Sequence, residues 1–222
     1  MFAHDCRLTA ISVGYRLAPE HPYPAAPHDC FDAAEYLVDH AEELYGAPLR
    51  FLGGESAGGC LAALAAFHLR RTRPAHDIAG LVLPFGEFDL TLGLPSVASY
   101  TRPLVANRAE LERFNAAYVP GMAITERRSA AVSPLFENLP ALVQEHGKKL
   151  PPALFLCGTE DPLLDDTLLM GMKWMMTGSE AVVKIYPGEP HGFTLFPGKA
   201  AAEATDVTIQ FVREKLAAQD HV

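Results

Sequence analysis

The chain has 222 residues, of which 49% are hydrophobic and 20% are charged, and this composition predicts a globular protein with a substantial core. The formal net charge is −9, and no basic run is long enough to follow a phosphate backbone, so we expect no nucleic-acid partner. No apolar run has the length of a membrane span, and no histidines have metal-ligand spacing, so we expect no membrane partner, metal or cofactor.

The four cysteines form no Cys-x-x-Cys pair. Two of them, Cys60 and Cys157, fall in segments that we expect to be buried, and reduced, inert thiols of this kind favour a cytoplasmic protein. The first residues also lack the cationic and apolar stretches of a signal peptide.

Strand-like and helix-like segments alternate along the chain. The predicted strands are short apolar runs at residues 8–15, 49–52, 78–85, 153–157 and 181–186. The predicted helices are amphipathic or alanine-rich segments at residues 30–45, 60–67, 107–118, 165–177 and 202–217. Apolar strands separated by helices predict an α/β fold, with a mostly parallel sheet covered on both faces, in a single domain over residues 1–222.

Residues 87–150 interrupt this alternation. Asn107, with Glu110 three residues later, is typical of a capping box at the start of a short helix. We expect this excursion to lie over the ends of the sheet, because loops at the carboxyl ends of parallel strands build binding and catalytic sites.

A Gly-x-Ser-x-Gly motif with Ser56 at its centre is the most informative feature of the chain. It lies between the predicted strand at 49–52 and the predicted helix at 60–67, which is the context of a nucleophile elbow. The glycines allow the strand and helix to approach closely, so that the serine hydroxyl projects into a site. We expect the amide of Ala57, at the helix N-terminus, to face a developing oxyanion.

A serine nucleophile needs a base, and the base needs a carboxylate to orient it. Asp161 follows the predicted strand at 153–157, and His191 follows the predicted strand at 181–186. Pro162 favours an extended conformation for Asp161. We therefore predict a triad of Ser56, Asp161 and His191.

Three other acids crowd the loop around Asp161. We expect Asp165 to cap the following helix, Asp166 to complement the dipole of that helix, and Glu160 to be solvated.

Taken together, these segments resemble the hormone-sensitive-lipase-like family of carboxylesterases, which have the α/β-hydrolase fold. The resemblance extends from about residue 9 to residue 196, and its motifs are YRLAPEHPYPAA at 15–26, GESAGG at 54–59, DPL at 161–163 and HGF at 191–193. It implies Ser56 as nucleophile, Asp161 as orienting acid and His191 as base. It also implies structural hydrogen bonds from Glu20, while Glu55 stands where family members more often have aspartate.

One motif of the family has no counterpart here. Family members carry a His-Gly-Gly-Gly segment whose amides complete the oxyanion hole, and they place a strand between the strands predicted at 8–15 and 49–52. We therefore expect an N-terminally truncated hydrolase fold, or a strand supplied by another chain, for example in a homo-oligomer. A third alternative is that the two strands close up and leave a damaged site.

The leading functional interpretation is a serine carboxylesterase that cleaves small or medium acyl esters through an acyl-enzyme. One alternative is an acyltransferase that hands the same acyl group to an alcohol or amine, and another is a catalytically impaired hydrolase fold used for binding. Apolar residues near the expected site are candidate substrate-pocket walls, with core packing favoured for the first of them: Phe85, Phe88, Leu90, Phe193 and Leu195.

Overall fold

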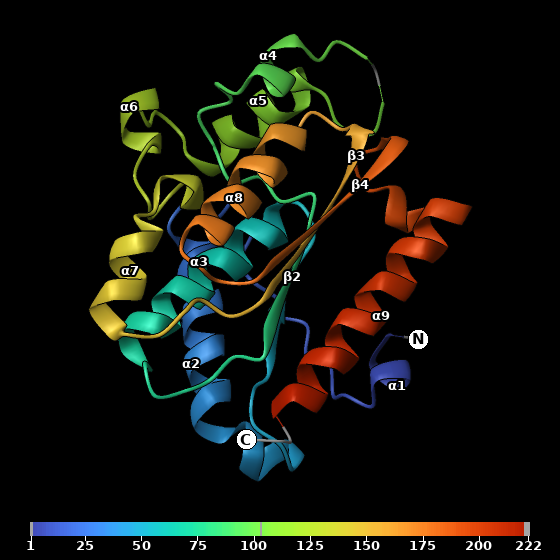
Figure 1. Ribbon diagram of the computed structural model, residues 1–222. Coiled ribbons are helices and arrows are strands. Elements are labelled where there is room, and N and C mark those ends of the chain that lie inside the picture. Colours follow the sequence, from blue (N-terminus) through green and yellow to red (C-terminus); the bar gives the residue numbers. More distant parts are fainter. Residues whose placement is uncertain (1, 103, 220–222) are drawn as a thin grey trace.

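Four parallel strands form the central sheet in the computed structural model, which describes residues 2–102 and 104–219 (Figure 1). They are β1 (Phe51–Gly53), β2 (Gly80–Pro84), β3 (Ala153–Glu160) and β4 (Ala181–Pro190), and they pair in this order. Leu52 lies opposite Leu81, and Leu154 lies opposite Val182. The carboxyl ends of all four strands therefore meet at one edge, and the predicted parallel sheet is confirmed.

The first predicted strand in chain order, at residues 8–15, is wrong. This segment forms no helix or strand, and it lines a cleft of about 750 Å³ together with residues of β1. Ile11 and Val13 of the segment and Phe51 and Leu52 of β1 are among the residues that line it. The β-branched pattern favours an extended backbone, but a strand also needs a hydrogen-bonded neighbour, and none lies beside this segment in the described part of the chain.

Helices cover both faces of the sheet, as predicted (Figure 1). One face carries α2 (Ala25–Tyr45), α3 (Ala57–Thr72) and α8 (Leu164–Met176), and the other carries α9 (Lys199–Gln219) with α1 (Phe2–Cys6) against it. None of the described helices combines the length and the apolar character that crossing a membrane requires.

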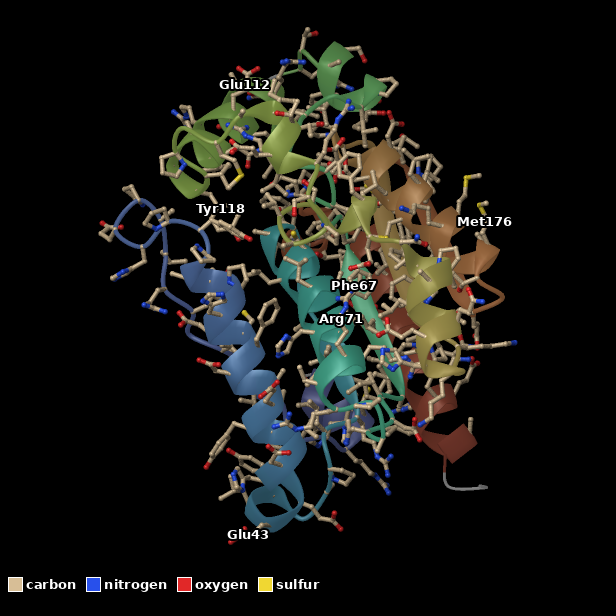
Figure 2. The ribbon with its side chains drawn as sticks, turned by 90° about the vertical axis from the view of Figure 1, so that its left-hand side faces the viewer. Glu43, Phe67, Arg71, Glu112, Tyr118 and Met176 are labelled. Carbon is tan, nitrogen blue, oxygen red and sulfur yellow. The ribbon has the colours of Figure 1, made fainter. Side chains whose placement is uncertain are left out.

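The central helix α3 is apolar almost all round because it is covered from several sides. In Figure 2 it carries the labelled Phe67 and Arg71 and lies beside α2. Phe67 is 1% exposed and packs with Phe155 and Trp174 in the core between α3, α8 and the sheet. This packing explains why a helix rich in alanine and leucine shows little amphipathic pattern in its sequence.

In the described part of the excursion between β2 and β3, the chain forms five short helical elements. They are α4 (Pro95–Ser99), α5 (Arg108–Tyr118), α6 (Ile124–Arg127), the 3₁₀ helix η1 (Pro134–Phe136) and α7 (Leu139–His146). Both α4 and α5 lie beyond the carboxyl ends of the strands, at the top of Figure 1. In contrast, α7 packs beside α3 and α8, with Leu139 and Leu142 in the core. Asn107 caps α5, and its side chain accepts a hydrogen bond from the Glu110 amide at 3.1 Å.

The loop before α2 is held by a different residue from the one that the sequence suggests. Arg16 forms a two-pronged ion pair with Asp29, and its own backbone amide also donates to that carboxylate. Glu20 is exposed, and within the described residues its side chain accepts no hydrogen bond. The expectation of structural hydrogen bonds from Glu20 is therefore wrong.

Candidate active site

Ser56 lies on a strained turn between β1 and α3. Its φ of 54° and ψ of −119° are unusual for a residue with a side chain and cost on the order of 1–3 kcal/mol. Two of its backbone hydrogen bonds join Ser56 to the end of β2 and the residues that follow it. The Ser56 amide donates to the Pro84 carbonyl at 3.1 Å, and the Glu87 amide donates to the Ser56 carbonyl at 3.4 Å. The turn is thus fastened to the end of β2, and it presents the serine side chain at the carboxyl edge of the sheet.

Two positions around this turn leave little or no room for a side chain. A Cβ on Gly54 would lie 2.4 Å from the carbonyl oxygen of Gly58, and a Cβ on Gly59 would lie 3.0 Å from the Cα of Gly86. A Cβ on Gly58 itself would meet nothing within 4 Å. The close approach of strand and helix therefore depends on Gly54, Gly59 is tightly packed, and Gly58 has space for a Cβ.

The three predicted triad side chains form one hydrogen-bonded chain. His191 Nε2 lies 2.9 Å from Ser56 Oγ, and His191 Nδ1 lies 2.9 Å from Asp161 Oδ2. Asp161 is 1% exposed, and its other carboxylate oxygen accepts a hydrogen bond from the Leu163 amide at 2.8 Å. A buried carboxylate on Nδ1 keeps the proton there and leaves Nε2 as an acceptor for the serine hydroxyl.

The loop that carries His191 is fixed from two directions. β4 ends at Pro190, and Gly192 adopts a left-handed conformation with φ of 68° that turns the chain away. The Phe85 ring packs against the imidazole in a T-shaped arrangement, with ring centroids 4.9 Å apart. Thr194 donates to Glu55 at 3.1 Å, which connects the histidine loop to the elbow.

Ala57 is the first residue of α3, directly after the nucleophile. Within the described residues, its amide donates to no backbone carbonyl, so it is available at the helix N-terminus. A free amide at this position suits a negative charge that develops next to Ser56 Oγ.

The acids that follow Asp161 have other roles than the sequence suggests. Asp165 does not cap α8, whose N-cap is Leu163; it accepts a hydrogen bond from the Ser96 amide at 2.7 Å. Glu160 is not simply solvated, because Arg102 pairs with it. Both partners come from the excursion after β2, which no local pattern could place here.

Asp166 lies in the first turn of α8, but its main contacts are elsewhere. It is fully buried, and one carboxylate oxygen accepts hydrogen bonds from the amides of Phe88 and Asp89, each at 2.7 Å. Burial raises its pKa well above the usual value. Asp166 therefore anchors the turn that follows β2, a role that the dipole argument did not predict.

Most of the candidate pocket residues lie in the core. Phe88, Leu90 and Phe193 are at most 2% exposed, and Phe88 packs edge-on against Phe155. Leu195, in contrast, is 72% exposed. These surroundings favour a packing role for the first three and leave Leu195 as the candidate with open surface.

Sequence reasoning missed Glu87, a buried acid beside this site. Its carboxylate accepts a hydrogen bond from Asn115 at 3.0 Å, and burial raises its pKa to about 7, against the opposing effects of Asn115 and His191. A signal was available, since Glu87 lies two residues after the apolar segment 78–85, at the carboxyl edge of the predicted sheet. No cluster of histidine, cysteine or acidic residues in the described chain is arranged to hold a metal.

The chain is similar to a known protein family and to known carboxylesterases. Residues 1–195 match a family described by the alpha/beta hydrolase fold. Carboxylesterase NlhH of Mycobacterium tuberculosis is 34% identical over 203 residues, which are 88% of this chain and 60% of the relative. The chain thus spans about 60% of the length of this curated relative.

Solved structures of esterases are also similar to this chain. The hyperthermophilic esterase of the archaeon Pyrobaculum calidifontis superposes with a TM-score of 0.83 and 31% identity, over 96% of this chain and 68% of that one. The thermostable carboxylesterase EstE1, from a metagenomic library, has a TM-score of 0.84 and 29% identity, over 97% of this chain and 71% of that one.

Proposed function

The chain belongs to the hormone-sensitive-lipase-like family of α/β hydrolases, and from this premise we propose that it is a serine carboxylesterase acting on small or medium acyl esters. The observation that carries the proposal is the continuous hydrogen-bond chain from Asp161 through His191 to Ser56. Its two contacts, each 2.9 Å long, join side chains from three separate segments at one edge of the sheet. Such a chain activates a serine hydroxyl for acyl transfer.

The reaction begins with the removal of a proton from Ser56. His191 Nε2 accepts this proton while Ser56 Oγ attacks the ester carbonyl, and Asp161 stabilises the imidazolium that forms. The carbonyl oxygen becomes an oxyanion, and the free amide of Ala57 donates to it. The imidazolium then protonates the leaving alcohol, which leaves the acyl group on Ser56. Water, deprotonated by the same histidine, releases the acid.

Small esters are proposed as substrates because the relatives named above are esterases and carboxylesterases. A cytoplasmic location and a homo-oligomeric state belong to the same proposal. The four cysteines, which are all unpaired, support the first of these.

Turnover of p-nitrophenyl butyrate tests the proposal. The Ser56→Ala variant should lose on the order of 10⁴- to 10⁶-fold in kcat/KM, because removal of a triad nucleophile disables the whole group. Ser99→Ala, which changes an exposed serine on α4, is the matched control and should keep full activity. Added methanol, with methyl butyrate as the product to detect, separates hydrolysis from acyl transfer. Retention of most of the turnover by Ser56→Ala would refute the assignment.

A further inference from the structure

The sheet becomes irregular just before Asp161, the acid that contacts His191. The pairing of β3 with β4 shifts in register between Gly158 and Glu160, and Glu160 lies opposite Pro190. Proline has no N–H, so Pro190 donates no hydrogen bond to the ladder at this point. The sheet alone therefore holds Asp161, the next residue, less firmly than it holds the residues within β3.

Two side chains from the excursion hold Glu160 instead. Tyr100, directly after α4, is half-buried, and its hydroxyl donates to the carbonyl oxygen of Glu160 at 2.7 Å. Arg102 pairs with the carboxylate of the same glutamate. The carbonyl of Glu160 belongs to the planar peptide group that continues into Asp161. The hydrogen bond from Tyr100 therefore fixes the backbone that leads directly into the orienting acid.

The residues after Asp161 are fastened to the same part of the excursion. The amide of Ser96, in α4, donates to Asp165 Oδ2 at 2.7 Å. Leu163, whose amide donates to Asp161 Oδ1 at 2.8 Å, is fully buried in an apolar cluster of the excursion. The other members of this cluster are Leu92, Val97 and Leu111. The acid is thus held from both sides by a segment that lies beyond the carboxyl ends of the strands (Figure 1).

On the basis of the proposed function, we propose that Tyr100 is a positioning residue of the esterase, whose hydroxyl fixes the peptide group before Asp161 and thereby directs the carboxylate toward His191. The direction matters because Asp161 Oδ2 lies 2.9 Å from His191 Nδ1, and a small displacement of a catalytic group lowers the rate. Tyr100 acts through Asp161 and not on the substrate, so its effect falls on kcat rather than on KM.

Steady-state kinetics with p-nitrophenyl butyrate give the first test. Tyr100→Phe keeps the ring and removes only the hydroxyl that holds Glu160. We expect kcat to fall roughly 5- to 30-fold, with KM changed less than about twofold. Tyr36→Phe removes a hydroxyl from a tyrosine of α2 that is 54% exposed. It is the matched control and should keep the wild-type kcat.

Proton NMR reports on the contact through which Tyr100 acts. A hydrogen bond from His191 Nδ1–H to a buried carboxylate gives a proton signal far downfield of the amide region, and His191→Ala identifies this signal by removing it. In Tyr100→Phe the signal should move upfield or broaden, because the hydrogen bond becomes longer or less well aligned. In Tyr36→Phe it should stay in place. A loss of global stability alone would not move it while the protein remains folded.

The outcomes distinguish the two proposals. A lower kcat together with a displaced or broadened signal in Tyr100→Phe supports the role of Tyr100. An unchanged kcat, or a lower kcat with an unchanged signal, overturns this role while leaving the esterase assignment intact. A wild type that hydrolyses the ester without showing the signal also overturns it, because the contact to be positioned is then not formed. A wild type no faster than Ser56→Ala overturns both proposals.

Discussion

Replacement of Glu87 with glutamine should stabilise the folded protein above neutral pH. Burial raises the pKa of this carboxyl from 4.5 to about 7 in the folded state. One pKa unit corresponds to about 1.36 kcal/mol, so holding the ionised form in the folded protein costs about 3 kcal/mol at pH 8. Glutamine has no charge and does not incur this cost.

The direction of this pH effect on stability follows from proton binding by the folded and unfolded states. The unfolded chain releases the Glu87 proton near pH 4.5, whereas the folded protein keeps it until about pH 7. The folded state therefore binds more protons between these values, and its stability falls as pH rises through this window. Asp166, whose pKa is also raised by burial, adds to the fall in both proteins. The difference between wild type and variant reports mainly on Glu87.

Urea unfolding followed by circular dichroism gives the required free energies. The advantage of Glu87→Gln over wild type should be about 3 kcal/mol larger at pH 8 than at pH 4.5. Any penalty from an unpaired glutamine N–H is the same at both pH values and cancels. Glu137→Gln, at a glutamate that is also 8% exposed but pairs with Arg71, is the control and should not reproduce this gain at pH 8. An equal difference between wild type and Glu87→Gln at both pH values would refute the reasoning.

Two further substitutions test the elbow and the orienting acid. Asp161→Asn should lower kcat for p-nitrophenyl butyrate about 10⁴-fold by favouring the wrong imidazole tautomer, whereas Asp165→Asn, which can still accept from Ser96, should change it less than about threefold. Equal losses in the two variants would contradict the assignment of the orienting acid. Gly54→Ala should lower the free energy of unfolding by about 1–3 kcal/mol in urea titrations, because its Cβ would lie 2.4 Å from the carbonyl oxygen of Gly58. An unchanged unfolding midpoint would show that the turn does not need this glycine.

The parts of the site that the sequence predicts are those encoded by local segments. Ser56, Asp161 and His191 each follow an apolar strand, and parallel strands bring their carboxyl ends to one edge. Four strands and the faces covered by helices follow from apolar periodicity in the same way. Position after a strand was therefore enough to place the three side chains near one another.

The sequence-based predictions that are wrong concern contacts between segments far apart in the chain. Residues 8–15 have the composition of a strand, but pairing depends on a neighbour that composition does not specify. Asp165 and Asp166 look like helix-capping acids, yet backbone amides from residues 88–96 bind them. The hydrogen bond to the Glu87 carboxylate comes likewise from a distant residue, Asn115, which belongs to a helix of the excursion.

Covalent labelling with a fluorophosphonate tests the central claim, an activated nucleophile at Ser56, most directly. The account predicts a single phosphonyl adduct, located on Ser56 by tandem mass spectrometry, with p-nitrophenyl butyrate turnover lost in proportion to labelling. Ser56→Ala should take up no label, and His191→Ala should take it up much more slowly, because the proton acceptor 2.9 Å from Ser56 Oγ is gone. Absence of labelling in the wild type, or an adduct on another residue with Ser56 unmodified, would contradict the account.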